Sequence, residues 1–266
     1  MNPLASWFGQ RLAAFLTRPY EGASVPTSDA RALAAALQPG DVLLVEGNTR
    51  ISRVIKALTQ SNWSHAAMCV AVADTAGHSG GKQPVLIEAD LKEGVREVSL
   101  AAYAQQHTRI CRPVGLTAED RARVLDFMRS RLGHHYDLKN VFDLARYLLP
   151  APPVPRRWRR PLMRLGSGDP TRAICSTLIA QAFQSVRYPI LPIIRREASN
   201  DPACADCWNE ILYIRHHSLF TPKDFDVSPY FEVVKPTLRS GFDYRRLRWG
   251  GGDGSPAGIA DAAIPA

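Results

Sequence analysis

The chain of 266 residues has few cysteines and no long apolar run. Its five cysteines are an odd number at irregular spacing, which excludes a disulfide framework and predicts free thiols in a reducing compartment. No apolar stretch approaches the roughly 18 residues of a membrane-spanning helix, and no secretory signal or internal repeat is visible. We therefore expect a cytoplasmic protein, either free or held peripherally at a membrane.

Positive charge is in excess and unevenly placed. The chain has 33 Lys and Arg against 25 Asp and Glu. The segment from Arg146 to Arg172 contains seven arginines and a single acidic residue, Asp169. This pattern favours an anionic partner such as a phospholipid surface or a polyanion, although a solvated basic loop fits it equally well. Arg is interleaved with Trp, Leu and Met in this stretch, which suits an anionic membrane. No nucleic-acid motif is present, so we expect no nucleic-acid partner.

Three segments are expected along the chain. Residues 1–37 begin with an amphipathic helix, which either docks on the protein or lies on a membrane surface. Residues 38–238 hold the remaining periodic elements, interrupted at 150–170 by a Pro- and Arg-rich excursion that cannot be a continuous helix. Residues 239–266 are expected to be a disordered tail, because from about Trp249 the chain is mostly Gly, Ala, Pro and Asp.

Hydrophobic periodicity predicts an α+β fold. Short links between the apolar runs from residue 41 to residue 114 indicate strands that pair mostly antiparallel. Thr117 is the expected cap of a helix ending at Gly133, and Asp137 that of a helix running to residue 149. Expected helices cover 28–38, 50–58 and 171–183, and expected strands cover 41–47, 65–73, 84–89, 94–100, 108–114 and 231–235. Residues 190–220 give no clear pattern.

One cysteine lies where a thiol can be activated. Cys175 follows Pro170 and Thr171, two helix-start signals, so it falls in the first turns of a helix, whose free N–H groups favour a thiolate. It shares one face of that helix with apolar residues, so the thiol should point inward. Taken alone, it fits a small buried hydrophobe as well as a nucleophile.

A histidine and a glutamate complete a possible catalytic set. His65 begins an apolar strand, where backbone pairing would hold an imidazole in place as a general base. Glu88 ends the next strand, an unusual place for a carboxylate without a partner. If the two strands are neighbours, Glu88 could orient the His65 ring as the acid of a triad does.

The order of the motifs resembles the circularly permuted papain-like amidases of the NlpC superfamily. The resemblance spans roughly residues 38–235 and rests on five segments in family order: "PGDVLLVEG" with "SHAAMCVAVAD", "VLIEADLKEGVREVSL", "GHHYD", "ICSTLIAQAF" and "LFTPKDFDVSPYFEVV". It implies a permuted papain-like fold, with a mostly antiparallel sheet packed against the helix that bears the nucleophile.

The resemblance also implies site residues and a reaction. Cys175 would be the nucleophile, His65 the general base and Glu88 the orienting residue. Tyr136 would line the substrate cleft, and Ser64 and Asp41, which lie in the Ser-His and Gly-Asp motifs, are further substrate-binding candidates. The reaction would cleave an amide or ester of a peptide-like or acyl-lipid substrate through a thioester. It needs no cofactor or metal.

Other interpretations stay open at this point. The chain would be an acyltransferase or lipid hydrolase if another acceptor replaced water, or a catalytically silent lipid- or protein-binding module of the same fold. Cys204 and Cys207 have CxxC spacing ahead of His216 and His217, a partial zinc pattern that also fits free loop cysteines. His134 and His135 beside Tyr136 are alternative bases. The sequence does not predict an oligomeric state.

Overall fold

The computed structural model describes residues 28–74, 82–90, 93–134, 174–198 and 208–239, with the single residues 18, 26, 243 and 245. Four segments with sequence predictions lie outside the described residues. They are the N-terminal amphipathic helix, the helix expected at 136–149, the excursion at 150–170 and most of the tail. Within the described part of the chain, no helix is both long and apolar enough to cross a bilayer.

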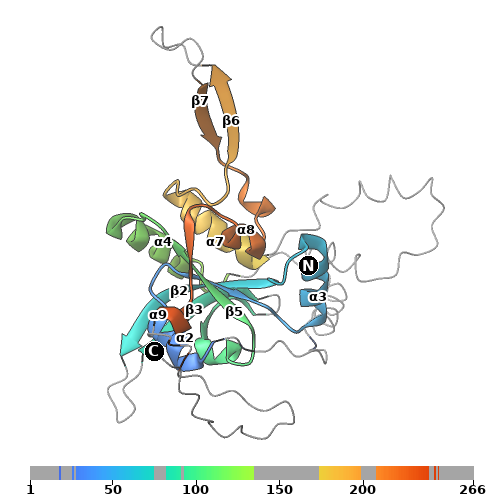
Figure 1. Cartoon of the computed structure of the whole chain (residues 1–266), viewed down its shortest axis with the longest axis vertical. Coiled ribbons are helices and arrows are strands. Elements are labelled where there is room, and N and C mark those ends of the chain that lie inside the picture. Colours follow the sequence, from blue (N-terminus) through green and yellow to red (C-terminus); the bar gives the residue numbers. More distant parts are fainter. Residues whose placement is uncertain are drawn as a thin grey trace, which may run out of the picture.

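The described residues form a six-stranded sheet with helices on both faces and a separate two-stranded arm (Figure 1). The strands of the main sheet are β1 (Val42–Val45), β2 (His65–Asp74), β3 (Lys82–Asp90), β4 (Gly94–Ser99), β5 (Thr108–Pro113) and β8 (Phe231–Val234). The helices are α2 (Ala30–Ala36), α3 (Arg50–Thr59), α4 (Ala118–Ser130), α7 (Ile174–Ser185), α8 (Pro222–Asp226) and α9 (Pro236–Arg239), with short 3-10 turns η1 (Leu100–Tyr103) and η2 (His217–Leu219).

The main sheet has the order β4-β3-β2-β1-β5-β8, and every neighbouring pair is antiparallel. The sequence prediction of an α+β fold with a mostly antiparallel sheet is therefore confirmed. The hairpins β2–β3 and β3–β4 join strands that are adjacent in sequence, whereas β1 lies between β2 and β5. The start of β2 consequently lies in the interior of the sheet, with Val45 opposite His65.

Alternation along the strands divides the core into two apolar layers. On one face, Val42, Leu44, Met68 and Ile87 pack with the apolar stripes of α4 and α7. On the other face, Leu43, Val45, Cys69 and Leu86 pack with α2 and η1. Strands covered on both faces read as nearly continuous apolar runs, which is why "VLLV" and "HAAMCVAVA" show little alternation.

Helix caps occur where the sequence suggests them. The Thr117 hydroxyl accepts a hydrogen bond from the backbone N–H of Asp120 at 3.1 Å, as predicted for the start of α4. The "TPKD" segment begins α8: Pro222 occupies the first turn, and the Asp224 carboxylate accepts from the Thr221 backbone N–H at 2.6 Å. This part of the C-terminal family motif is thus explained by helix capping alone.

Helix α7 is fastened to the C-terminal part of the chain by side chains at both of its ends. The buried Ser176 hydroxyl donates to the Phe220 carbonyl at 2.7 Å, and the Gln184 amide donates to the Arg215 carbonyl at 2.6 Å. Just after the helix, the Tyr188 hydroxyl lies 2.6 Å from the Tyr230 carbonyl. These contacts fix the orientation of α7 relative to the sheet.

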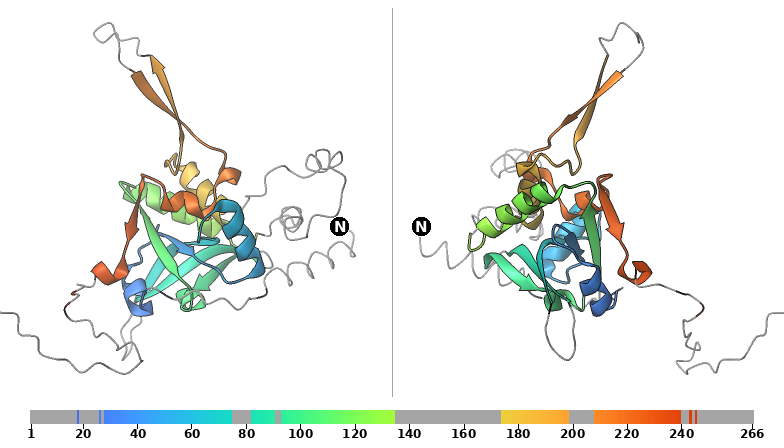
Figure 2. Two further views of the ribbon diagram at one scale, coloured as in Figure 1. Left: turned by 45° about the vertical axis from the view of Figure 1, so that its right-hand side comes forward. Right: turned by 90° about the vertical axis from the view of Figure 1, so that its left-hand side faces the viewer.

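The region 190–220, which gave no clear pattern, contains an arm. Strands β6 (Ile193–Ala198) and β7 (Trp208–Tyr213) form an antiparallel hairpin separate from the main sheet. The arm projects from the end of the body where α7 and α8 lie, and it stands clear of the body in every view (Figures 1 and 2).

Candidate functional site

His65 and Glu88 meet in the structure. His65 is the first residue of β2, and Glu88 of β3 lies opposite Ala67, two residues further along β2. The His65 Nε2 atom lies 2.5 Å from Glu88 Oε2. The Glu88 side chain is 5% exposed and that of His65 is 24% exposed, so the carboxylate is buried while the ring keeps access to solvent.

Cys175 is the third member of this group. It is the second residue of α7, and its side chain is buried. Its sulfur is near enough to His65 to raise the pKa of the imidazole. The structure therefore brings together the three residues that the sequence singled out as a catalytic set.

The imidazole is held in its charged form. Burial alone would lower the pKa of His65, but the Cys175 sulfur and then the Glu88 carboxylate raise it from 6.5 to about 10. Burial alone would likewise raise the pKa of Glu88, but its contacts with His65, Tyr103 and Arg96 lower it from 4.5 to about 2. His65 and Glu88 therefore carry opposite charges across the neutral pH range.

Two residues that sequence reasoning missed complete the surroundings of Glu88. The Tyr103 hydroxyl donates to Glu88 Oε2, and the Arg96 Nε donates to Oε1 at 2.9 Å. Burial and the charge of Glu88 raise the pKa of Tyr103, so this phenol remains a donor. The hairpin register, with Asp90 opposite Gly94 and Glu88 opposite Arg96, was the signal that could have identified Arg96.

Ser64 supports the strand that carries His65. Its hydroxyl is buried and accepts a hydrogen bond from the Gly47 backbone N–H at 2.9 Å. A Cβ atom on Gly47 would lie 2.4 Å from Ser52 Oγ and 2.9 Å from Ser64 Oγ, so this close approach requires glycine. A role of Ser64 in substrate binding stays a prediction.

Asp41 is not brought to the site. Val42 lies opposite Met68 and Val45 opposite His65, so Asp41 precedes the end of β1 that is remote from the imidazole. Its carboxylate accepts from Arg112 at 2.6 and 2.8 Å and from the Gln38 backbone N–H at 2.8 Å. We assign Asp41 to stabilisation of the sheet rather than to substrate binding.

Other sequence candidates are remote or not described. Tyr136, His135, Cys204 and Cys207 lie outside the described residues. His134 is exposed, and its backbone carbonyl accepts from the Val95 N–H at 2.9 Å, so the chain enters the Tyr136 segment beside β4. Among the residues with described positions, no group of three or more His, Cys, Asp or Glu side chains is arranged to hold a metal ion.

The charge state of Glu88 makes stability depend on acid pH. Because the folded-state pKa of Glu88 is lowered to about 2, its contribution is complete above pH 4.5 and is lost as the pH falls toward 2. We expect the free energy of unfolding to drop by about 3 kcal/mol across this window through this group. Urea unfolding at stepped pH would measure it.

A substitution isolates the part due to Glu88. The variant Glu88→Gln should show a clearly shallower loss of stability below pH 4.5. The matched control is Glu119→Gln, whose side chain is 75% exposed and which should keep the wild-type slope. Equal slopes in all three proteins would contradict the assignment of a lowered pKa to Glu88.

Comparison with known proteins finds a family model that matches part of the chain. Residues 36–147, which include His65 and Glu88, match the model described as "Permuted papain-like amidase enzyme, YaeF/YiiX, C92 family". No curated protein matches the chain significantly. The crystal structure of metalloprotein yiiX from Escherichia coli O157:H7 is similar with a TM-score of 0.44 and 16% identity, over 75% of this chain and 97% of that one.

The family match supports a cysteine hydrolase or amidase-like role. It also agrees with the α+β architecture and the antiparallel sheet. The resemblance to the permuted papain-like amidases is confirmed by the match of residues 36–147, whereas its assignment to the NlpC superfamily stays a prediction.

Proposed function

We propose that this chain is a cysteine hydrolase that cleaves an amide or ester bond through Cys175, His65 and Glu88. The observation that carries the proposal is that one imidazole lies 2.5 Å from the Glu88 carboxylate and has its pKa raised by the nearby Cys175 sulfur. Nucleophile, base and orienting acid are the three parts that covalent acyl transfer requires. The family of residues 36–147 supports the same class of chemistry.

The reaction would proceed in two steps. The Cys175 sulfur, paired with the His65 imidazolium, attacks the acyl carbon, and His65 gives its proton to the departing amine or alcohol. This leaves a thioester on Cys175 and a neutral imidazole. His65 then takes a proton from water, whose oxygen attacks the thioester and releases the acid, and the proton returns to the sulfur–imidazole pair.

The position of Cys175 in α7 contributes to the first step. Cys175 is the second residue of α7 as the structure describes it, so its backbone N–H lies near the N-terminal end of the described helix. It is suited to donate to the oxyanion that forms on the substrate carbonyl. Glu88, held by Arg96 and Tyr103, keeps the His65 ring in one orientation throughout.

The substrate class is proposed from the same resemblance. A peptide-like amide and an acyl-lipid are both compatible with a thiol nucleophile, and transfer to an acceptor other than water would make the chain an acyltransferase. A peripheral contact with an anionic membrane through the Arg-rich segment 150–170 would favour a lipid. A catalytically silent binding module of the same fold is the alternative.

An acyl-trapping experiment tests the proposal. Mixing the protein with p-nitrophenyl acetate should release one p-nitrophenolate per chain in a burst and leave one acetyl group on Cys175, detected by peptide mass spectrometry. The variant Cys175→Ala should lose both the burst and the adduct, because no other thiol lies beside a charged imidazole in the described structure. Cys69→Ala, a buried cysteine in the sheet, is the matched control.

The outcome separates the enzyme from the binding module. Acetyl groups spread over several cysteines without a burst, or a burst that survives in Cys175→Ala, would reject catalysis by Cys175. Adding a primary amine during the decay of the thioester separates transfer from hydrolysis, since an acyltransferase would form the amide in preference to acetate.

A further inference from the structure

The main sheet is stabilised by six paired strands and by apolar layers on both faces, whereas the arm formed by β6 and β7 has only two strands. Its two strands pair with each other in a separate two-stranded sheet. An isolated two-stranded hairpin is marginally stable in water, whereas three or more strands, or packing on another layer, give independent stability. Figure 2 shows the arm projecting away from the body, and no helix or strand of the described residues covers it.

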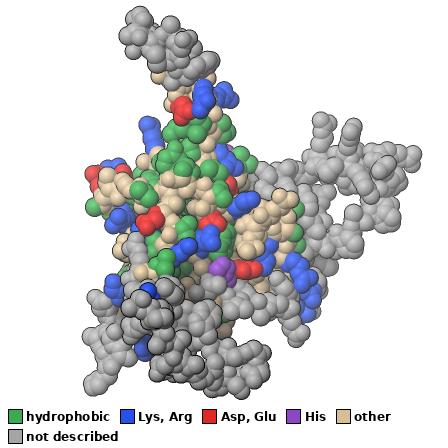
Figure 3. Space-filling view, viewed as in Figure 1, with side chains coloured by type: hydrophobic (Ala, Val, Ile, Leu, Met, Phe, Trp, Pro, Cys, Tyr) green, Lys and Arg blue, Asp and Glu red, His purple; other side chains and the backbone are tan. Residues whose placement is uncertain are grey.

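Both faces of the arm are apolar near the body. Side chains of Ile193, Ile211 and Tyr213 lie on one face, and those of Ile194, Leu212 and Ile214 lie on the other. Each of the six is between 37% and 61% exposed. On the face of the arm seen in Figure 3, hydrophobic side chains gather on the half next to the body, with charged side chains beyond them. Contiguous exposed apolar side chains of this kind mark an interaction surface.

The free edge of β6 carries a charge pattern that is complementary to itself. Arg195 and Glu197 lie on the same face, opposite Ile211 and Asn209 of β7, and among the described residues neither forms an ion pair. If two β6 strands pair antiparallel about a two-fold axis at residue 196, Arg195 of each copy lies opposite Glu197 of the other. Arg196 of each copy would then lie opposite Arg196 of the other copy. Each of these arginines is already paired, at 3.1 Å, with Glu210 of its own chain.

The charge of the whole arm agrees with this arrangement. Residues 193–214 hold two arginines and four acids, whereas the rest of the chain holds 31 basic and 21 acidic residues. The four acids include Asp201 and Asp206 in the segment of sequence that joins β6 to β7. Antiparallel pairing would bring the outer end of each hairpin beside the basic body of the other copy. An anionic membrane would instead repel an acidic tip.

We propose that the arm joins two copies of this chain, by antiparallel pairing of their β6 edges into one four-stranded sheet. Edge strands with open N–H and C=O groups are templates for such pairing, and a two-fold axis makes each contact occur twice. The four-stranded sheet supplies the neighbours that the single hairpin lacks. This inference does not depend on whether Cys175 is catalytic.

Charge reversal on the full-length chain tests the pairing. Sedimentation velocity from low to high micromolar concentration should show a monomer–dimer equilibrium in the wild type. The variants Arg195→Glu and Glu197→Arg should each raise the dimer dissociation constant about tenfold, because each places like charges opposite one another twice. The double variant Arg195→Glu/Glu197→Arg restores opposite charges and should return the constant to about the wild-type value.

Controls separate pairing of the arms from other associations. Val114→Glu removes an exposed apolar side chain that lies outside the arm and should leave the dimer unchanged. A wild type that stays monomeric throughout, or a double variant as weak as the single variants, would overturn the proposal. So would wild-type binding to anionic phosphatidylserine vesicles that is lost in Ile194→Glu, since lipid would then be the occupant.

Discussion

Replacing His65 by alanine is expected to slow alkylation of Cys175 at pH 6 by about a hundredfold. A thiol without a cationic partner ionises near pH 8.5, so only about one molecule in several hundred would be thiolate at pH 6. In the wild type the Cys175 sulfur and the Glu88 carboxylate raise the pKa of His65 to about 10, so the imidazole keeps its proton and its positive charge throughout the neutral range. Removing it leaves Cys175 without its counter-charge.

Labelling with iodoacetamide, followed by peptide mass spectrometry, would measure this rate for each cysteine separately. The rates at Cys175 in the wild type and in His65→Ala, measured at the same pH, should differ by about a hundredfold. Cys69 serves as an internal reference in the same sample, because burial and the nearby Asp41 raise its pKa to about 12.

An exposed histidine provides the matched control. His134→Ala removes an imidazole beside the expected cleft without touching the Glu88–His65 contact, and it should leave labelling of Cys175 unchanged. If His134→Ala slowed the reaction as much as His65→Ala, the base would be assigned wrongly. Equal and slow labelling of all five cysteines would favour the binding module.

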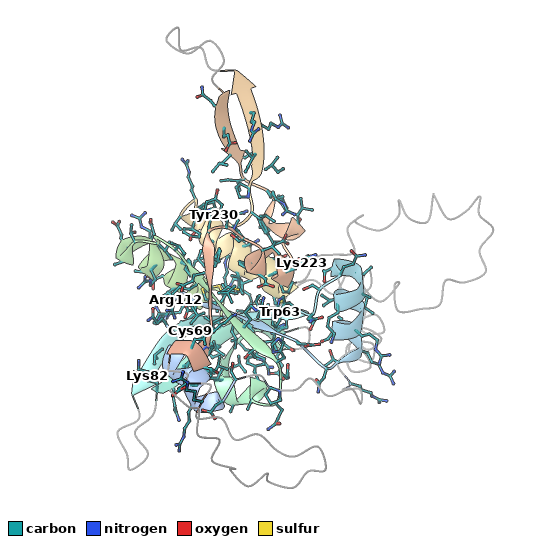
Figure 4. The ribbon with its side chains drawn as sticks, in the orientation of Figure 1. Trp63, Cys69, Lys82, Arg112, Lys223 and Tyr230 are labelled. Carbon is teal, nitrogen blue, oxygen red and sulfur yellow. The ribbon has the colours of Figure 1, made fainter. Side chains whose placement is uncertain are left out.

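Truncation of Asp41 is expected to be the most destabilising single change at a described ion pair. The Asp41 side chain is 2% exposed and that of its partner Arg112 is 14% exposed. Figure 4 labels Arg112 within the sheet close to Cys69, whose backbone N–H donates to the Asp41 carbonyl. Asp41→Ala would leave a guanidinium buried without its carboxylate, which costs about 3–5 kcal/mol.

Urea unfolding would measure this loss as a lower midpoint at unchanged slope. The matched control is Asp126→Ala, which removes an exposed carboxylate 3.3 Å from Arg129 and should cost under about 1 kcal/mol. Asp41→Leu combined with Arg112→Met removes both charges and should recover much of the stability, because the unpaired charge causes the loss. A small effect of Asp41→Ala would contradict a structural role.

Much of the main sheet could be predicted because its signals are local. The start of α4 follows from Thr117 as a cap, and the antiparallel pairing follows from links too short for crossovers. The position of β5 between β1 and β8 could not be predicted, because residues 100–107 do not determine which edge the next strand joins. That choice depends on packing between segments distant in sequence.

The candidate site was partly predictable for the same reason. A carboxylate at Glu88 within an apolar run demands a partner, and the strand start at His65 supplied one on an adjacent strand. Tyr103 was not foreseen, because η1 brings it back onto the face of β3 through a turn without a sequence signature. The arm escaped recognition because its strands are apolar on both faces near the body and polar on both faces further out, so they lack the alternation of a strand with one wet face.

The fastening of α7 has a mechanical consequence for the arm. One root of the arm follows α7 directly, where the Ile190 carbonyl accepts from Ser228, and the other ends at Arg215, whose carbonyl holds Gln184. Any load placed on the projecting hairpin therefore reaches the helix that carries Cys175 before it reaches the strands that carry His65 and Glu88. The hairpin is therefore connected more directly to the helix that carries Cys175 than to the strands that carry His65 and Glu88.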